Sequence, residues 1–306
     1  PITPRVGCPR QERIYILSPA ARVGPDSHPA HFEKCLKSVL RFQIYDNVWW
    51  QNDPDVSYLA TGLPSRVLGP TPQGEGMWKT WHAITTLVGG TSMNSEPLQA
   101  EDCRAVWRQA EVMRPSSAEP ARLLTLGRSP RNTIFGFSAS RPYGDFAVYN
   151  LYNDSPGTKS LPLNFHDAGL PAGVNCAIFD YWQNRVIGYA KDSYTTAPLK
   201  YYASALLRFT PLKGDAPVLV GSNLHLSIGA TEVRDIRAKA NELEIKLTDA
   251  GAQDGVLTFF SKKPLEAKGA KNCKIVSVES AGENLWKVNL AGRQWGKPQS
   301  VSLVIK

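Results

Sequence analysis

Hydrophobic and polar positions alternate along the first third of the chain in a way that predicts short buried strands separated by amphipathic helices. Residues 14–17 form a short apolar run, and residues 31–42 place apolar side chains at i, i+3, i+4, i+7 and i+8, which is one face of a helix. That face consists of Phe32, Cys35, Leu36, Val39 and Leu40. The same patterns predict a second strand near residues 44–48, a second helix over 77–87 and a third strand near 91–94.

A third helix is expected after the third strand. Glu101 and Asp102 suit its first turn, where acidic groups interact favourably with the helix dipole. Val106, Trp107 and Ala110 lie along one face. A strand followed by a helix, three times over, is typical of a parallel α/β sheet or barrel. Three such units are too few for a closed eight-stranded barrel, which takes about 250 residues. The pattern therefore leaves open a small open sheet or one part of a barrel.

The periodicity changes after residues 114–117. From there on, short β-rich runs alternate with turn residues, which indicates an antiparallel sandwich of roughly ten strands. The predicted strands cover residues 133–138, 146–152, 174–182, 202–209, 218–220, 255–260, 274–278, 285–290 and 300–305.

Composition and charge exclude several classes of protein. Of the 306 residues, 42% are hydrophobic and 20% charged, which is a globular and not a disordered composition. The net charge of +8 lies entirely in residues 121–306, but no aromatic side chains interleave the scattered Lys and Arg, so we expect no nucleic acid as partner. No apolar stretch approaches the roughly 20 residues that span a membrane. A soluble protein is expected, and a secreted or periplasmic bacterial location stays open.

Polar residues follow each predicted strand of the first third. These loops span residues 21–26, 49–55 and 93–98, and each contains a carboxylate. In a parallel barrel the reacting groups lie at the carboxyl ends of the strands. Cleavage of a glycosidic bond requires such a cluster at one edge: carboxylates, an arginine such as the nearby Arg22, and tryptophan side chains.

These loops resemble a known family. The segments R-V-G-P-D (22–26), W-W-Q-N-D-P-D (49–55) and S-M-N-S-E-P-L (92–98) are similar to the last three strand-helix units of the melibiase clan, glycoside hydrolase families 27 and 36, with bacterial family 36 the better match. The resemblance implies an α/β plus all-β fold. Residues 1–118 would be the carboxy-terminal portion of a TIM (β/α)8 barrel, and residues 119–306 an antiparallel β-sandwich. It also implies a retaining hydrolase acting on terminal α-galactosides.

The resemblance assigns roles residue by residue. Asp26 matches the general acid/base, and Arg22 matches the arginine that contacts the sugar. Asp55 matches a carboxylate that lines the pocket near the first subsite, Trp50 is expected to line the cleft, and Asp53 is expected to orient the loop. The family's nucleophile is an aspartate well upstream of the acid/base, but none of the 25 residues before Asp26 is an aspartate. We therefore expect an amino-terminal half, on a separate or missing segment, to supply the nucleophile, and this chain alone to be inactive.

Other chemistry is not expected. His28 and His31 follow Asp26 without cysteine or acidic partners at ligand spacing, so neither a metal site nor a cofactor is predicted. The alternative function is a non-catalytic carbohydrate-binding module, in which the sandwich holds sugar and the strand-helix units are a scaffold. The choice between galactose and N-acetylgalactosamine stays open.

Overall fold

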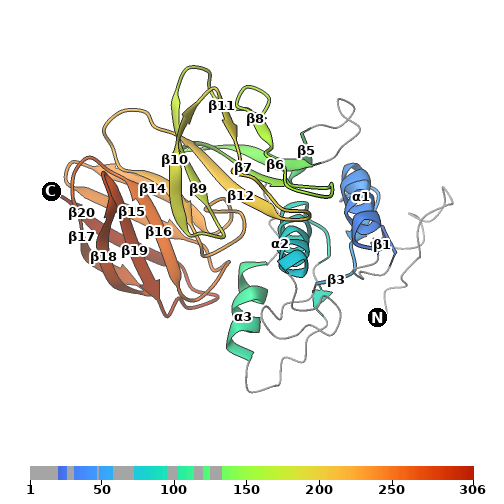
Figure 1. Cartoon of the computed structure of the whole chain (residues 1–306). Helices are drawn as coiled ribbons and strands as arrows, with labels where there is room; N and C mark the ends of the chain where they lie inside the picture. The colour runs from blue at the N-terminus through green and yellow to red at the C-terminus, as the bar shows by residue number, and fades with distance from the viewer. Residues whose placement is uncertain are drawn as a thin grey trace. The chain divides into compact units, whose positions relative to one another are not determined.

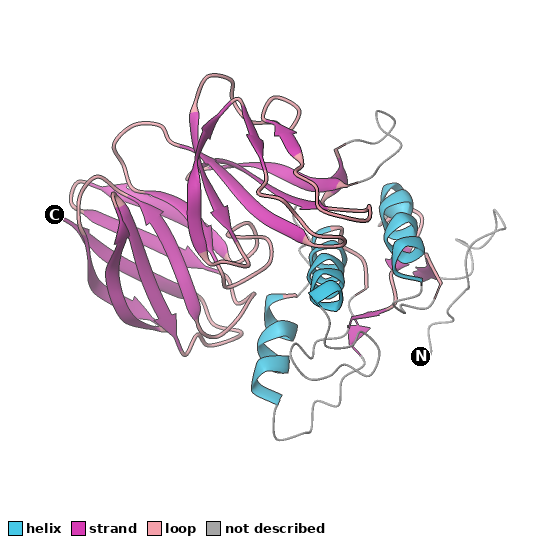
Figure 2. Cartoon of the chain, viewed as in Figure 1, coloured by secondary structure: helices cyan, strands magenta, loops and turns pink. Residues whose placement is uncertain are grey.

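The computed structural model describes residues 20–25, 31–46, 48–57, 72–91, 93–94, 103–113, 120–124 and 133–306 (Figure 1). The chain divides into two compact units. The first comprises Pro1–Gly136, Asn150–Leu161 and Thr196–Ser204, and the second Phe137–Tyr149, Pro162–Thr195 and Ala205–Lys306. Within the described residues, helices occur in the first unit and strands dominate the second (Figure 2). The domain boundary after residue 118 stays a prediction.

Strands and helices alternate in the first unit. The strands are β1 (Ala20–Arg22), β2 (Gln51–Asp53), β3 (Val56–Ser57) and β4 (Met93–Asn94). The helices are α1 (Phe32–Phe42), the 3-10 helix η3 (Gln43–Tyr45), α2 (Pro72–Leu87) and α3 (Cys103–Val112). β1 pairs with β2 and β3 with β4, both in parallel. The predicted parallel arrangement is thus present, but among the described residues it forms separate two-stranded sheets and not a closed barrel.

The predicted apolar face of α1 is confirmed. All five of its predicted apolar residues are at most 6% exposed, and the helix packs against α2. The Phe32 ring lies 6.3 Å from that of Trp81 in α2 and 5.0 Å from that of Tyr202. Gly76 brings α2 close to the backbone of Tyr202, because a Cβ at residue 76 would lie 2.9 Å from the Tyr202 carbonyl oxygen.

The strand predicted near residues 44–48 is wrong. Residues 43–45 form η3 instead, Ile44 and Val48 are 55% and 71% exposed, and the strand is β2, at Gln51–Asp53. The apolar run misled the prediction because the buried residues of the true strand, Asn52 and Asp53, are polar. Trp107, predicted on the apolar face of α3, is 47% exposed. The strand predicted at residues 14–17 lies outside the described residues.

A six-stranded sheet follows, in the order β10-β9-β12-β7-β6-β5. Its strands are β5 (Arg122–Leu123), β6 (Ile134–Arg141), β7 (Gly144–Tyr152), β9 (Asn175–Asp180), β10 (Arg185–Lys191) and β12 (Ser204–Pro211). The short strands β8 (Pro162–Asn164) and β11 (Ser193–Thr195) pair with each other. No helix in the described residues is both long and apolar enough to cross a membrane.

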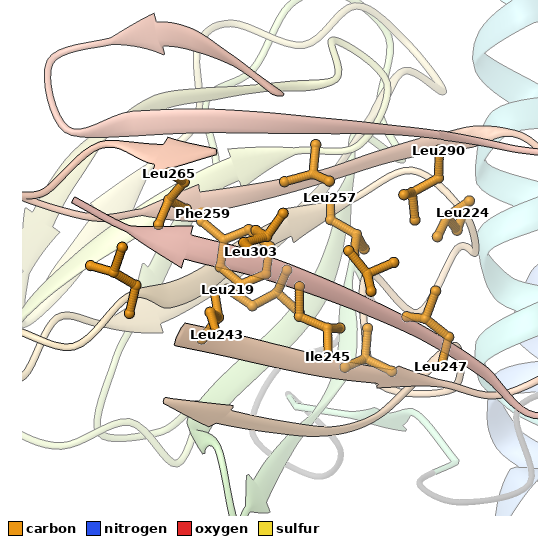
Figure 3. Close-up of a cluster of buried hydrophobic side chains, with 14 residues drawn as sticks. Leu219, Leu224, Leu243, Ile245, Leu247, Leu257, Phe259, Leu265, Leu290 and Leu303 are labelled. Atoms are coloured by element: carbon orange, nitrogen blue, oxygen red, sulfur yellow. The ribbon is translucent and has the colours of Figure 1, made fainter. Parts of the chain in front are cut away.

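Two four-stranded antiparallel sheets, formed by residues 218–305, complete the second unit and share one core. One sheet contains β13 (Val218–Ser222), β16 (Gly255–Phe260), β19 (Leu285–Ala291) and β18 (Lys274–Gly282). The other contains β14 (Val233–Lys239), β15 (Glu242–Leu247), β20 (Gln299–Ile305) and β17 (Leu265–Lys271). Side chains from both sheets, among them Phe259 and Leu303, point into the interior (Figure 3).

Candidate active site at the strand ends

The parallel pairing of β1 and β2 brings Arg22 beside Asp53. The register places these two residues opposite each other, and the Val23 amide donates to the Asp53 carbonyl oxygen at 3.1 Å. Because parallel strands end at the same edge, the residues that follow both strands gather at one place. The sequence-predicted residues Arg22 and Asp55 meet there.

Arg22 and Asp55 form an ion pair between the guanidinium Nη2 and the carboxylate Oδ2. The two side chains are 17% and 11% exposed, so the pair is largely withdrawn from water. A cation and a carboxylate held together at low exposure hold each other in a defined orientation, since separating them would leave an uncompensated charge. Such a pair offers both donors and acceptors to the hydroxyl groups of a sugar.

The backbone of Asp55 adopts a conformation that non-glycine residues seldom adopt, with φ at +79°. Its amide donates to Asp53 Oδ1 at 3.0 Å, so the side chain of Asp53 holds this turn. A non-glycine residue in this region costs on the order of 1–3 kcal/mol and persists only where the surroundings impose it. The chain thus keeps a carboxylate where glycine would be easier to accommodate.

Asn52 explains how a polar strand can be buried. Its amide donates to Asp46 Oδ1 at 2.6 Å, its side-chain Nδ2 donates to the Phe42 carbonyl oxygen at 2.9 Å, and its Oδ1 accepts from Trp50 Nε1 at 2.8 Å. Its carbonyl oxygen accepts from the Thr91 amide at 2.8 Å. Buried polar groups are tolerated when they are hydrogen-bonded in this way.

Asp46 supports β2 by accepting a hydrogen bond from the Asn52 amide. The sequence did not predict this role. Burial raises the pKa of Asp46, and the hydrogen bond from the Asn52 amide lowers it in part. No spacing rule links a carboxylate to an amide six residues along the chain outside a helix, so the sequence held no signal for this contact.

The turn after α2 approaches β2 closely through Gly89 and Gly90. Both have φ at +83°, and a Cβ on Gly90 would lie 2.7 Å from the Asn52 carbonyl oxygen. A Cβ on Gly89 would lie 3.0 Å from Asp46 Oδ2. Glycine is therefore needed here both for backbone conformation and for space.

The two tryptophans before β2 differ in exposure. Trp50 is 7% exposed and donates its Nε1 hydrogen to Asn52, whereas Trp49 is 54% exposed and stacks on Tyr45 with ring centroids 4.9 Å apart. Both precede β2 and so lie at the end of the strand opposite to Asp55. The role of Trp50 in lining the cleft stays a prediction.

Asp26, the predicted acid/base, lies outside the described residues, as does Glu96. Its assignment stays a prediction. The described chain stops on one side at Pro25, whose carbonyl oxygen lies 3.5 Å from the Cys35 Sγ of α1, and resumes at His31. Within the described part of the chain, no group of three or more His, Cys, Asp or Glu side chains could hold a metal ion.

No protein family and no curated protein matches the sequence. Among solved structures, α-galactosidase I from Mortierella vinacea is 13% identical with a TM-score of 0.46, and the match covers 65% of this chain and 54% of that one. A family 27 β-L-arabinopyranosidase from Geobacillus stearothermophilus is 13% identical with a TM-score of 0.49, covering 66% of this chain and 47% of that one. An isomalto-dextranase from Arthrobacter globiformis T6 is 11% identical with a TM-score of 0.42, covering 94% and 56%.

These three proteins are glycoside hydrolases by name, and the chain spans about half of their length.

Proposed function

We propose that this chain is part of a retaining glycoside hydrolase that acts on terminal α-galactosides. The observation that carries the proposal is the Arg22–Asp55 ion pair at the ends of the parallel strands β1 and β2. Its support is the strained turn that Asp53 holds around Asp55, because backbone strain concentrates at functional sites. In this proposal Arg22 and Asp55 bind the hydroxyl groups of the sugar.

Asp26 acts first as general acid and then as general base. In the first step its proton passes to the glycosidic oxygen as that oxygen leaves, while a carboxylate from the amino-terminal half attacks the anomeric carbon and forms a covalent glycosyl-enzyme. In the second step Asp26 takes a proton from water as the water cleaves that intermediate, which gives net retention. The two carboxyl groups should lie about 5–5.5 Å apart, the separation typical of retaining enzymes.

One observation favours a second candidate, a non-catalytic carbohydrate-binding module that holds sugar on the strand-helix units and not on the predicted sandwich. Trp49 is 54% exposed and stacked on Tyr45, and exposed aromatic faces of this kind support sugar rings. In that case Trp49→Ala would abolish sugar binding, and the carboxylate variants would leave it unchanged.

The test of the hydrolase uses the complete enzyme, meaning this chain together with the segment that supplies the nucleophile. Asp26→Ala should slow the hydrolysis of natural galactosides by about 10²–10⁴, and that of aryl galactosides far less, because a good leaving group needs little protonation. Azide should restore activity on the aryl substrate by replacing the missing base. Asp55→Ala is the matched comparison and should impair both substrates, since a sugar-binding carboxylate acts whatever the leaving group. Equal losses for Asp26→Ala on both substrates, without rescue, would contradict the assignment.

A further inference from the structure

A cavity of about 210 Å³ lies within the second unit, and nothing in the proposed hydrolysis uses it. Its walls come from the turn between β6 and β7, from β12 with the loop that follows it, and from the start of β13. Sites for drug-sized ligands measure roughly 300–1,000 Å³, so this cavity suits a smaller molecule.

Arg208 of β12 lines this cavity and is 1% exposed. Its Nε donates to Thr210 Oγ1 at 2.9 Å, its Nη1 to the Ile228 carbonyl oxygen at 2.6 Å and its Nη2 to the Leu219 carbonyl oxygen at 3.1 Å. A guanidinium group carries five N–H donors, so two remain without an acceptor in the described chain. The Phe146 ring covers one face of the group, 3.8 Å from the guanidinium carbon.

The charge of Arg208 is incompletely compensated. Within the described chain no carboxylate lies within ion-pair distance of it, and Glu232, which acts on it at longer range, accepts hydrogen bonds from the Gly229 amide at 2.8 Å and from Ser227 Oγ at 3.3 Å. Burial lowers the pKa of Arg208 to about 10, which still leaves it cationic at neutral pH. Buried charges are normally paired, so a buried cation beside a cavity favours an anion in that cavity.

The other charged and hydroxyl side chains of the lining also suit an anion. Thr210 Oγ1 accepts from Arg208, which leaves its own hydroxyl hydrogen for a ligand. Lys213 adds a second cation, and Asp145, the one carboxylate in the lining, is already held by Ser140 Oγ at 2.8 Å and by the Lys213 ammonium at 3.5 Å. Two cations and one carboxylate leave one net positive charge, which a monoanion would neutralise.

We propose that this cavity binds a small organic carboxylate of monosaccharide size, with Arg208, Thr210 and Lys213 as the groups that recognise the carboxylate. A planar guanidinium matches a carboxylate better than it matches a neutral sugar. The apolar wall formed by Pro217 and Val218 would contact the body of the ligand.

The experiment measures binding to the full chain by titration calorimetry, with glucuronate as the probe, glucose as the neutral analogue and inorganic phosphate as the alternative anion. Glucuronate should bind saturably, glucose should not bind, and phosphate should bind more weakly than glucuronate. Thr210→Val should weaken glucuronate binding about tenfold, as expected for a lost hydrogen bond to a charged group, and Thr210→Ser should restore it. Lys213→Gln should weaken it about two- to fivefold, because this lysine is 57% exposed.

Asp145→Asn gives the sharpest test because its expected effect on glucuronate affinity is opposite to that of the Thr210→Val and Lys213→Gln variants. Removing the carboxylate from the lining should tighten glucuronate binding several-fold, whereas Lys268→Gln, a change on the exposed strand β17, should leave it unchanged. Arg208 is not varied, since its burial makes its loss a folding defect, and circular dichroism checks that each variant is folded. Equal binding of glucose, tighter binding of phosphate, no binding by the folded protein, or weaker binding by Asp145→Asn would each overturn the proposal.

Discussion

Asp55 has a backbone conformation that glycine would adopt more easily, and the ion pair of its carboxylate with Arg22 helps to stabilise it. The φ of +79° costs free energy that only the surroundings can offset. The amide bond to Asp53 and the ion pair to Arg22 supply that compensation. In the proposed hydrolase the carboxylate would therefore be positioned before the substrate arrives, which would lower the entropic cost of binding it.

The Arg22–Asp55 pair should be strongly coupled in a double-mutant cycle. Arg22→Met leaves a largely buried carboxylate without its cation, so we expect it to lower the free energy of unfolding by about 2–4 kcal/mol. In a protein that already carries Asp55→Asn, adding Arg22→Met should lower the free energy of unfolding much less. The difference gives a coupling energy above about 1 kcal/mol. The measurement is denaturant unfolding of the two single variants and the double variant.

The matched control is Lys268–Glu242, an ion pair with a separation of 2.8 Å whose side chains are 52% and 43% exposed. Exposed pairs contribute about 0–1 kcal/mol, so its coupling should be smaller than that of Arg22–Asp55. Coupling energies that are equal for the two pairs would show that Arg22 and Asp55 do not form a buried pair in solution.

At the scale of elements, the sequence predicted the helices and strands well where the buried residues are hydrophobic, and poorly where the buried residues are polar. The face of α1 was predictable because its apolar residues recur at helical spacing. β2 was not, because Gln51–Asp53 is polar and the burial of its Asn52 depends on hydrogen bonds with Asp46, Phe42 and Thr91. Every predicted strand after residue 130 overlaps an observed one. Among those missed, β14 and β17 lie at the edges of their sheet, where charged residues such as Lys268 discourage edge-to-edge pairing and erase the alternating pattern.

Gly90 is where the turn after α2 approaches β2 most closely, so its replacement should be costly. Gly90→Ala would place a Cβ 2.7 Å from the Asn52 carbonyl oxygen in a residue with φ at +83°, so the turn after α2 must move away from β2. We expect thermal and denaturant unfolding to show a loss of at least about 3 kcal/mol, combining the strained conformation with the clash.

Gly157→Ala separates those two causes. Gly157 has φ at +85° but no atom within 4 Å of its added Cβ, so this variant carries the conformational cost alone, about 1–2 kcal/mol. Similar losses for the two variants would mean that the close approach of the turn to β2 contributes nothing to stability.

At the scale of the whole molecule, the candidate site could be predicted only in part. Spacing along the chain and the family resemblance named Arg22 and Asp55, and the structure brings them into contact. Asp53 was expected to orient the loop, and its side chain holds the turn at Asp55. The other supports came only from the fold, because Asp46, Gly89 and Gly90 contact β2 through pairings that no local pattern encodes. Nor did the sequence show that the second unit contains a cavity lined by a buried arginine.

The proposed hydrolysis needs one more carboxylate than the described strand ends can offer. Asp55 is engaged by Arg22, and Asp53 holds the amide of Asp55, so neither is placed to attack an anomeric carbon. We therefore expect the purified chain to show no turnover of 4-nitrophenyl α-galactoside, and turnover with retained configuration to appear when a polypeptide carrying the preceding barrel strands is added. Asp55→Asn in the mixture should raise KM, which separates sugar binding from mere assembly. Turnover by this chain alone would show that its own residues include the nucleophile, and the division of the site between two segments would then be wrong.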